Sequence, residues 1–194
     1  MSRYDKVFSM MMEKLKAELP GNLAYHNLEH ILDVLQAAIT LAELEKLTEK
    51  ETDLLKVAVL FHDSGYINTV ARHEEVGSDL AGELLPDFGY DENEIQQIQA
   101  MILVTKFPHK PKTQLEKIIC DADLDYLGRE DFFVIGNNLF KELKTLGSLS
   151  NIDQWNQLQV QFLKRHKYFT ESAISLRQKN KMNHLEIVEK LLEF

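Results

Sequence analysis

Four short segments of the chain carry side chains whose types and spacing could bind a metal ion and activate water. They read Tyr25-His26-Asn27-Leu28-Glu29-His30, Phe61-His62-Asp63-Ser64-Gly65-Tyr66, His73-Glu74-Glu75 and Asp121-Ala122-Asp123-Leu124-Asp125. Imidazoles and carboxylates together make a borderline-to-hard donor set that suits a divalent ion. Such an ion lowers the pKa of a bound water toward neutrality and polarises a phosphoryl oxygen. The chemistry that these segments favour is therefore hydrolysis.

The elements that must position these side chains are helices. Alternating patterns typical of half-buried strands are few. The sequence therefore predicts an all-α fold, a single-domain helical bundle over residues 1–194. Its motif-bearing core lies at about 22–128, and C-terminal helices follow at about 131–194. Apolar residues recur at helical spacing at 7–19, 31–44, 54–61, 76–85, 95–103, 115–122, 132–143, 152–162 and 170–194.

Three of the predicted helices supply ligands, near residues 30, 62 and 123. Adjacent residues on a helix point about 100° apart, because there are 3.6 residues per turn. His62 and Asp63 can therefore meet at one ion only where a helix ends, and Gly65 places such an end there. Each histidine alone is more often a hydrogen-bonded structural residue than a ligand, so the hypothesis depends on the joint order of the motifs.

The order of these motifs along the chain matches a known pattern. His30, then His62-Asp63, then Asp123 resembles the four-ligand signature of the HD-domain superfamily of metal-dependent phosphohydrolases, over roughly residues 22 to 128. The resemblance implies a helical bundle of HD-domain type. It also implies that these four residues hold a divalent ion, whether manganese, nickel, cobalt, magnesium, iron or zinc. In the related proteins the ligand is the Asp of an Ala-Asp-Leu triplet, so the resemblance implies Asp123 rather than Asp121 or Asp125.

A second resemblance concerns the first motif. Tyr25-His26-Asn27 followed by His30 is similar to a segment of the cyclic-nucleotide phosphodiesterases, which share the fold. There the first histidine is a general acid and the second binds metal, so the resemblance implies that His26 protonates the leaving oxygen. His26 and Asp63 are thus the catalytic candidates, and Asp63 is also a ligand. The rest of the long phosphodiesterase domain is absent, so its cyclic-nucleotide specificity is not carried over.

Two further histidines and two cations flank the proposed site in sequence. His73, on the loop after Asp63, and His109 could each bind a second ion or hydrogen-bond a phosphate, and the resemblance favours His109. The alternative for each is a solvent-exposed loop histidine. Arg72 and Lys106 are the candidate cations for a phosphate oxygen, because a charge-assisted hydrogen bond from Arg or Lys is the expected contact there.

The activity that these residues favour is hydrolysis of a phosphate mono- or diester by a metal-activated water, with a nucleotide or another small phosphorylated molecule as substrate. Two other classes stay open. A di-iron enzyme that activates oxygen would need more than four ligands, so it gains support if His73 and His109 both bind metal. A non-catalytic nucleotide-sensing or scaffold module would have no chemical need for the full ligand set.

Charge and composition narrow the partners and the compartment. The formal net charge of -9 disfavours binding to duplex nucleic acid or to an anionic membrane surface. No stretch approaches the roughly 18 apolar residues of a membrane span, and the N-terminus carries no apolar leader. With a single cysteine, Cys120, the chain can build no internal disulfide. We therefore expect a cytoplasmic protein.

The C-terminal third carries no motif of its own. Trp155 and Phe162 are expected to pack helices together rather than to stack on a base. The apolar stripe from Ile174 to Leu192 could pack internally or form a homodimer face.

Overall fold

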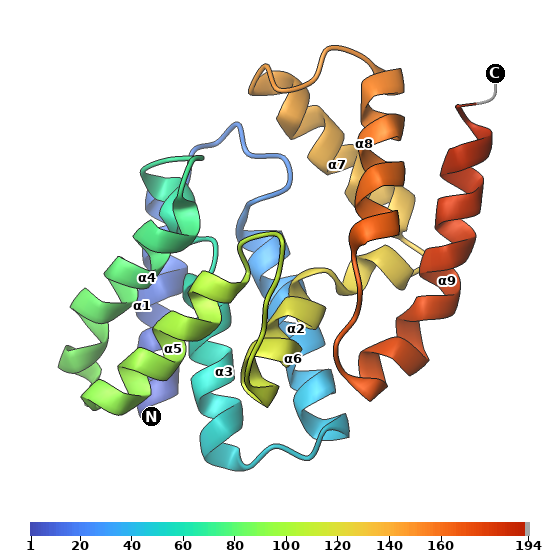
Figure 1. Ribbon diagram of the computed structural model, residues 1–194. Coiled ribbons are helices and arrows are strands. Elements are labelled where there is room, and N and C mark those ends of the chain that lie inside the picture. Colours follow the sequence, from blue (N-terminus) through green and yellow to red (C-terminus); the bar gives the residue numbers. More distant parts are fainter. Residues whose placement is uncertain (193–194) are drawn as a thin grey trace.

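Residues 1–192 are described by a computed structural model and form α-helices joined by short loops and 3-10 turns (Figure 1). The predicted all-α fold is confirmed, and each predicted apolar stripe overlaps one of the helices. Residues 193 and 194, which end the predicted C-terminal segment, lie outside the described residues. The α-helices are α1 (Arg3–Glu18), α2 (Leu28–Leu44), α3 (Glu49–Phe61), α4 (His73–Leu84), α5 (Glu92–Val104), α6 (Gln114–Asp123), α7 (Phe132–Thr145), α8 (Ile152–Arg165) and α9 (Glu171–Lys190). The 3-10 helices are η1 (Ser64–Ile67), η2 (Leu85–Phe88) and η3 (Asp125–Gly128).

Short polar residues fix where the ligand-bearing helices begin. The side chain of Asn27 accepts hydrogen bonds from the first backbone N–H groups of α2, one of them that of His30. Thr48 begins α3 and Thr113 begins α6 in the same way. Each cap satisfies a donor that the helix itself leaves free, and so stabilises one helix start over its neighbours. The register of the ligands is thereby set from within each helix.

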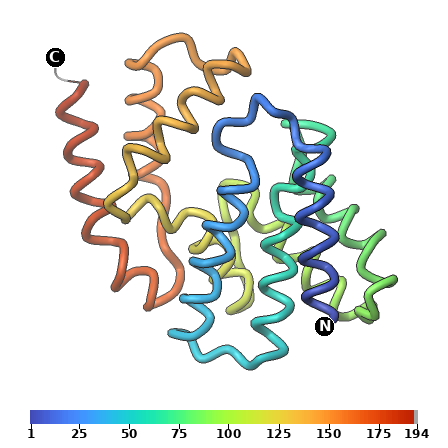
Figure 2. The backbone as a smooth tube through the Cα atoms, turned by 180° about the vertical axis from the view of Figure 1, so that it is seen from behind, coloured from blue at the N-terminus to red at the C-terminus, as the bar shows by residue number. Residues whose placement is uncertain are grey.

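Helix α3 is the centre of a first hydrophobic cluster, built mainly from α1 to α6. Its run from Val57 to Phe61 has no exposed surface at any position. A helix that is apolar all round must be covered on every side. Helices α1, α2, α5 and α6 contact it, and the view from behind shows α1 and α3 side by side (Figure 2). The C-terminal end of α3 is consequently held rigidly inside the molecule.

A second, smaller hydrophobic cluster joins η3 to α7, α8 and α9. It includes Leu127, Phe132, Leu163 and Val188, together with Tyr25 from the loop before α2. In Figure 1 these three helices stand to one side of the helices of the first cluster. Tyr25 and the end of α6 lie where the two clusters meet. The segments carrying the predicted chemistry are therefore placed at this boundary.

Helix α9 uses only part of its apolar stripe for packing. Ala173, Leu185 and Val188 are buried, whereas Met182 and Ile187 are among the apolar residues it leaves exposed. Internal packing thus accounts for one face of the stripe. None of the helices between residues 1 and 192 is both long enough and apolar enough to cross a membrane.

Candidate metal centre

The four predicted ligands lie at or near the ends of three helices. His30 is in the first turn of α2, His62 follows the last residue of α3, and Asp63 comes next. Asp123 is the last residue of α6. Helix ends relax the 100° spacing of neighbouring side chains, which is what allows His62 and Asp63 to turn toward the same point. The helix end that the sequence predicts at His62-Asp63 is present, because α3 ends at Phe61.

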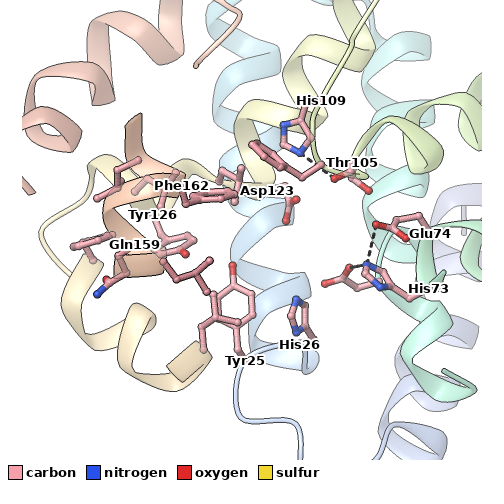
Figure 3. A pocket seen from close by; sticks show the side chains of 18 of the residues that line it. Tyr25, His26, His73, Glu74, Thr105, His109, Asp123, Tyr126, Gln159 and Phe162 are labelled. Atoms are coloured by element: carbon pink, nitrogen blue, oxygen red, sulfur yellow. Dashed lines mark hydrogen bonds and ion pairs between the residues drawn. The ribbon is translucent and has the colours of Figure 1, made fainter. Parts of the chain in front are cut away.

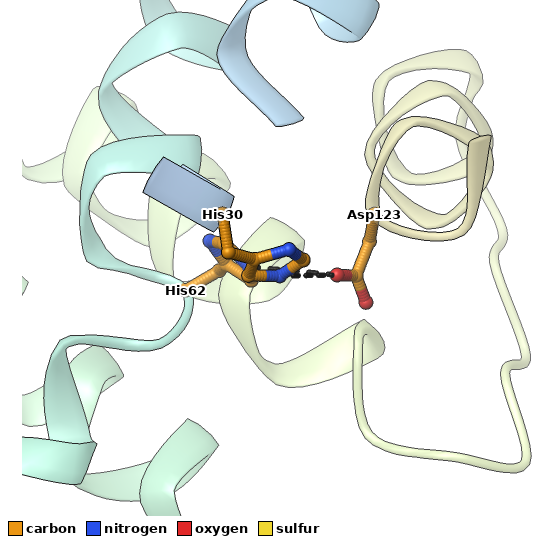
Figure 4. A group of neighbouring side chains, drawn as sticks. All are labelled: His30, His62 and Asp123. Atoms are coloured by element: carbon orange, nitrogen blue, oxygen red, sulfur yellow. Dashed lines mark ion pairs between the residues drawn. The ribbon is translucent and has the colours of Figure 1, made fainter. Parts of the chain in front are cut away.

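The side chains of His30, His62 and Asp123 converge (Figure 4), and Asp63 lies close to both imidazoles. One ligand atom from each of His30, His62 and Asp123 lies within 4.8 Å of the others. Nε2 of His30 is 3.3 Å from Oδ2 of Asp63 and 3.3 Å from Oδ1 of Asp123, and the corresponding distances from Nε2 of His62 are 3.4 and 3.5 Å. Donor atoms about 2.0–2.2 Å from a shared ion lie roughly 3.0–3.5 Å apart. The spacing therefore fits a divalent ion.

The hydrogen bonding of the ligands also fits an ion. Nδ1 of His62 bonds the backbone oxygen of Val59 at 2.8 Å. That nitrogen must carry the proton, so Nε2 keeps its lone pair. Within residues 1–192, Nε2 of His30, Nε2 of His62 and Oδ2 of Asp63 are buried without a hydrogen-bond partner. Buried polar atoms nearly always have partners, and a metal ion would serve all three.

The electrostatics favour positive charge at this point. Burial lowers the pKa of His30, but the carboxylates of Asp123 and Asp63 outweigh it and raise that pKa to about 9. The pKa of His62 is likewise raised despite burial. Burial would raise the pKa of Asp63 and of Asp123, yet the two imidazoles hold both below the ordinary value. The two carboxylates, that of Asp63 buried and that of Asp123 half-buried, thus attract either protons or a cation.

His26 stands beside this group and is held by Glu142, a residue of α7. Nδ1 of His26 contacts Oε1 of Glu142, and the other carboxylate oxygen accepts the backbone N–H groups of Tyr25 at 2.7 Å and His26 at 3.0 Å. Burial would raise the pKa of Glu142, but the His26 ring and these bonds keep it below its ordinary value. A carboxylate at Nδ1 fixes the tautomer and leaves Nε2 for chemistry.

Tyr66 packs between two of the histidines. Its ring stacks on His26 and on His73, with a centroid distance of 4.2 Å in each case. His73 is the first residue of α4, so the prediction that it lies on a loop is wrong. Its Nδ1 bonds the oxygen of Val70 at 3.0 Å, and its Nε2 lies 3.6 Å from Oδ1 of Asp63. His73 therefore approaches the carboxylate oxygen of Asp63 that faces away from the other two imidazoles.

A cavity of about 260 Å³ lies beside two of the four candidate ligands (Figure 3). Asp63 and Asp123 form part of its wall, and His26 faces it. Trp155 and Phe162 of α8 also line it. These two rings do pack on other aromatic residues, as expected, but the prediction missed that they also face the site.

Of the remaining predicted residues, one lines the cavity and two do not. His109 lines the cavity and donates Nε2–H to the oxygen of Thr105 at 2.9 Å, and burial lowers its pKa. Arg72 is exposed, and the side chain of Lys106 is paired with Glu75. Neither cation lines the cavity. The structure thus brings His73 against a ligand and leaves Arg72 and Lys106 outside.

Sequence reasoning missed Tyr66 and Glu142. Tyr66 directly follows the His62–Gly65 motif, so its place beside the site could have been noticed. Glu142 gave no signal, because it lies among ordinary surface-type residues of a helix and 116 positions from His26. Only its burial, with 1 % of the side chain exposed, reveals it.

Comparisons with known proteins agree with this arrangement. The model of one family, the HD domain, matches residues 27–125. A search of curated proteins finds no match. Among solved structures, a predicted HD superfamily hydrolase from an uncultured Thermotogales bacterium is similar, with a TM-score of 0.63 and 22% sequence identity. The similarity covers 99% of this chain and 92% of the other, so the fold extends over the C-terminal helices as well.

Proposed function

The chain belongs to the HD domain family, and from this premise we propose that it is a metal-dependent phosphohydrolase acting on a phosphate mono- or diester of a small molecule. One observation carries the proposal: two imidazoles and two carboxylates converge, with three buried donor atoms unpartnered among the described residues, at the wall of a cavity. The Thermotogales protein of the same fold, itself a predicted HD superfamily hydrolase, supports it.

His30, His62, Asp63 and Asp123 would hold the ion. When bound, a divalent ion supplies a water of lowered pKa and draws charge from a phosphoryl oxygen. The protein's part is to fix the donors before the ion arrives: the Val59 carbonyl holds the tautomer of His62, and burial keeps bulk water from competing.

His26 is placed to move the proton that the reaction requires. Glu142 accepts Nδ1–H, so the proton that can be given to a leaving oxygen sits on Nε2. Stacking on Tyr66 holds the plane of the ring. In this arrangement His26 is the catalytic acid and Glu142 a positioning residue.

His73 supports a second candidate function. Its Nε2 lies near Oδ1 of Asp63 and 3.4 Å from Oε1 of Glu74. Asp63 could therefore share its two oxygens between two ions, and a di-iron pair that activates oxygen would use such a set. The number of ions bound per chain separates the two functions.

The test compares two buried histidines with the same local chemistry. His62 and His184 each bond a backbone oxygen through Nδ1, at 2.8 and 2.9 Å, but His184 stacks on Phe132 of the second hydrophobic cluster. We expect His62→Gln to lose bound metal and His184→Gln to retain it. Metal is measured by elemental analysis, and hydrolysis of p-nitrophenyl phosphate and bis(p-nitrophenyl) phosphate is measured with manganese, nickel, cobalt or magnesium.

Hydrolysis by the parent chain that a chelator abolishes, and that His62→Gln lacks, is the expected result. The proposal fails if the metal-loaded chain hydrolyses neither ester. Two irons per chain without hydrolysis would establish the di-iron alternative instead.

A further inference from the structure

The far wall of the cavity is unlike the metal side. It is built from Phe107, Phe132, Leu139, Trp155, Leu158 and Phe162, which come from the loop after α5 and from α7 and α8. Phe132 and Trp155 are buried, and Leu158, with 39% exposure, lies nearest to solvent. Side chains of this kind gain free energy by covering apolar or aromatic surface. The wall therefore fits a ligand group that is itself apolar.

The charged residues around the cavity also favour an uncharged ligand group. No Lys or Arg of residues 1–192 lines it, whereas Asp63, Glu74 and Asp123 do. A divalent ion would offset two of these negative charges, and no Lys or Arg among the described residues lines the cavity to pair with an additional anionic group. Burying an unpaired carboxylate or phosphate against an apolar wall is unfavourable, because the charge loses its hydration without gaining a partner. The part of a substrate beyond its reacting phosphate must therefore be uncharged.

One polar side chain interrupts the apolar wall. Gln159 lines the cavity, is buried, and donates from Nε2 to Oδ1 of Asn156 at 3.4 Å. A neutral amide can bond an uncharged polar atom of a ligand, but it cannot neutralise an anion. Gln159 thus adds hydrogen-bonding selectivity without changing the charge preference.

The size of the cavity limits the ligand as well. A dry apolar cavity of roughly 150 Å³ accommodates one benzene ring. The cavity here is about 260 Å³ and includes the space next to the metal ligands. One ring group together with one phosphate would fill it.

We propose that this cavity selects a phosphate ester whose remaining group is an uncharged aromatic ring group and which carries no second anionic group; the proposal rests on the phosphohydrolase function. Its reacting phosphate would lie at His30, His62, Asp63 and Asp123. The ring would lie against Trp155, Phe162 and the neighbouring apolar side chains.

The test is a binding measurement that needs no turnover. Titration calorimetry on the metal-loaded chain compares benzylphosphonate with 4-carboxybenzylphosphonate, two stable ligands that differ by one carboxylate. We expect benzylphosphonate to bind at least about tenfold more tightly, since an unpaired charge at the apolar wall disfavours the second ligand.

A charge placed at the cavity mouth should change this preference. Leu158→Lys adds a cation where the wall meets solvent. We expect it to change the ratio of the two affinities about tenfold in favour of 4-carboxybenzylphosphonate. Leu44→Lys is the matched control. Leu44 is 50% exposed and ends α2, far along that helix from His30, so the same substitution there should leave the ratio unchanged.

Equal binding of the two phosphonates, tighter binding of the carboxylated one, or binding of neither would overturn the inference. The inference would also be overturned if Leu158→Lys and Leu44→Lys changed the ratio of the two affinities equally. A different result would contradict the proposed function alone: the chain would still bind benzylphosphonate more tightly, but it would hydrolyse neither nitrophenyl ester.

Discussion

His62 and His26 each turn one ring nitrogen away from the site and toward a hydrogen-bond acceptor. For His62 the acceptor is the backbone oxygen of Val59, three residues earlier on the same helix. For His26 it is Glu142, which reaches across from α7. Both bonds leave Nε2 available, which in the proposed function would serve an ion in His62 and a leaving oxygen in His26. Similar hydrogen bonds at Nδ1 thus orient two histidines for two different proposed roles.

Replacing Glu142 with glutamine should lower turnover without removing metal. We expect Glu142→Gln to reduce kcat at least about tenfold, because a neutral amide stabilises a protonated His26 ring less than a carboxylate does. Metal content and KM should change little, since Glu142 contacts none of the four ligands.

Glu94→Gln is the control for that substitution. Glu94 is also buried, but it pairs with Arg3, away from the cavity. Its kcat should match that of the parent chain. An unchanged kcat in Glu142→Gln, or loss of metal from it, would show that Glu142 does not position a catalytic acid.

At the scale of elements, close contact between η1 and α4 shapes the region after His62-Asp63. The sequence predicted that Gly65 ends a helix, and glycine at such a place commonly adopts a left-handed conformation. In the structure α3 already ends at Phe61, and Gly65 lies inside η1 without a positive φ. A Cβ atom there would lie 2.0 Å from the backbone oxygen of His73. Glycine is therefore required at position 65 because the backbone of His73, the first residue of α4, lies against it.

Gly65→Ala should consequently disturb both stability and the site. We expect a loss of about 1–3 kcal/mol in the free energy of unfolding, measured by urea denaturation, because backbone atoms must move apart. Activity should fall further than the population of unfolded chain explains, since Tyr66 and His73 would shift. Gly21→Ala is the matched control: a Cβ atom there meets nothing within 4 Å, and its effect should stay within about 0.5 kcal/mol. Similar stabilities of the two variants would contradict this explanation.

On the scale of the whole molecule, the candidate metal centre joins three helices that carry much of the first hydrophobic cluster. His30 belongs to α2, His62 follows α3 and Asp123 ends α6. The second cluster closes the other side of the cavity with α7 and α8. Because the donors converge only in the folded chain, an ion bound there must stabilise the native state over the unfolded one.

Metal should therefore raise the melting temperature. At an ion concentration about 100 times the Kd, the stabilisation is about 2.7 kcal/mol, which for a chain of this size corresponds to roughly 5–10 °C. Thermal unfolding followed by circular dichroism, with added metal and with a chelator, measures the shift. His62→Gln should show no shift, while His184→Gln should show the full one. An equal shift in both variants would place the stabilising ion elsewhere.

The sequence by itself determined the features that depend on neighbours along the chain. The helical stripes and the helix end at His62-Asp63 are local features, and the all-α prediction followed from the stripes. The order of the histidine and aspartate motifs indicated the family before any geometry was known. These features could be predicted because helical periodicity acts within a few residues.

Only the tertiary structure decided what surrounds the ligands. Glu142 and Tyr25 are 117 residues apart, yet a buried hydrogen bond joins them. Trp155 and Phe162 have the pattern of ordinary core residues, and the packing of α8 alone makes them a cavity wall. Arg72 and Lys106 are close to the motifs in sequence but point elsewhere. Such contacts depend on how helices pack across the molecule, and a helical pattern shows which face is apolar without showing what that face will meet.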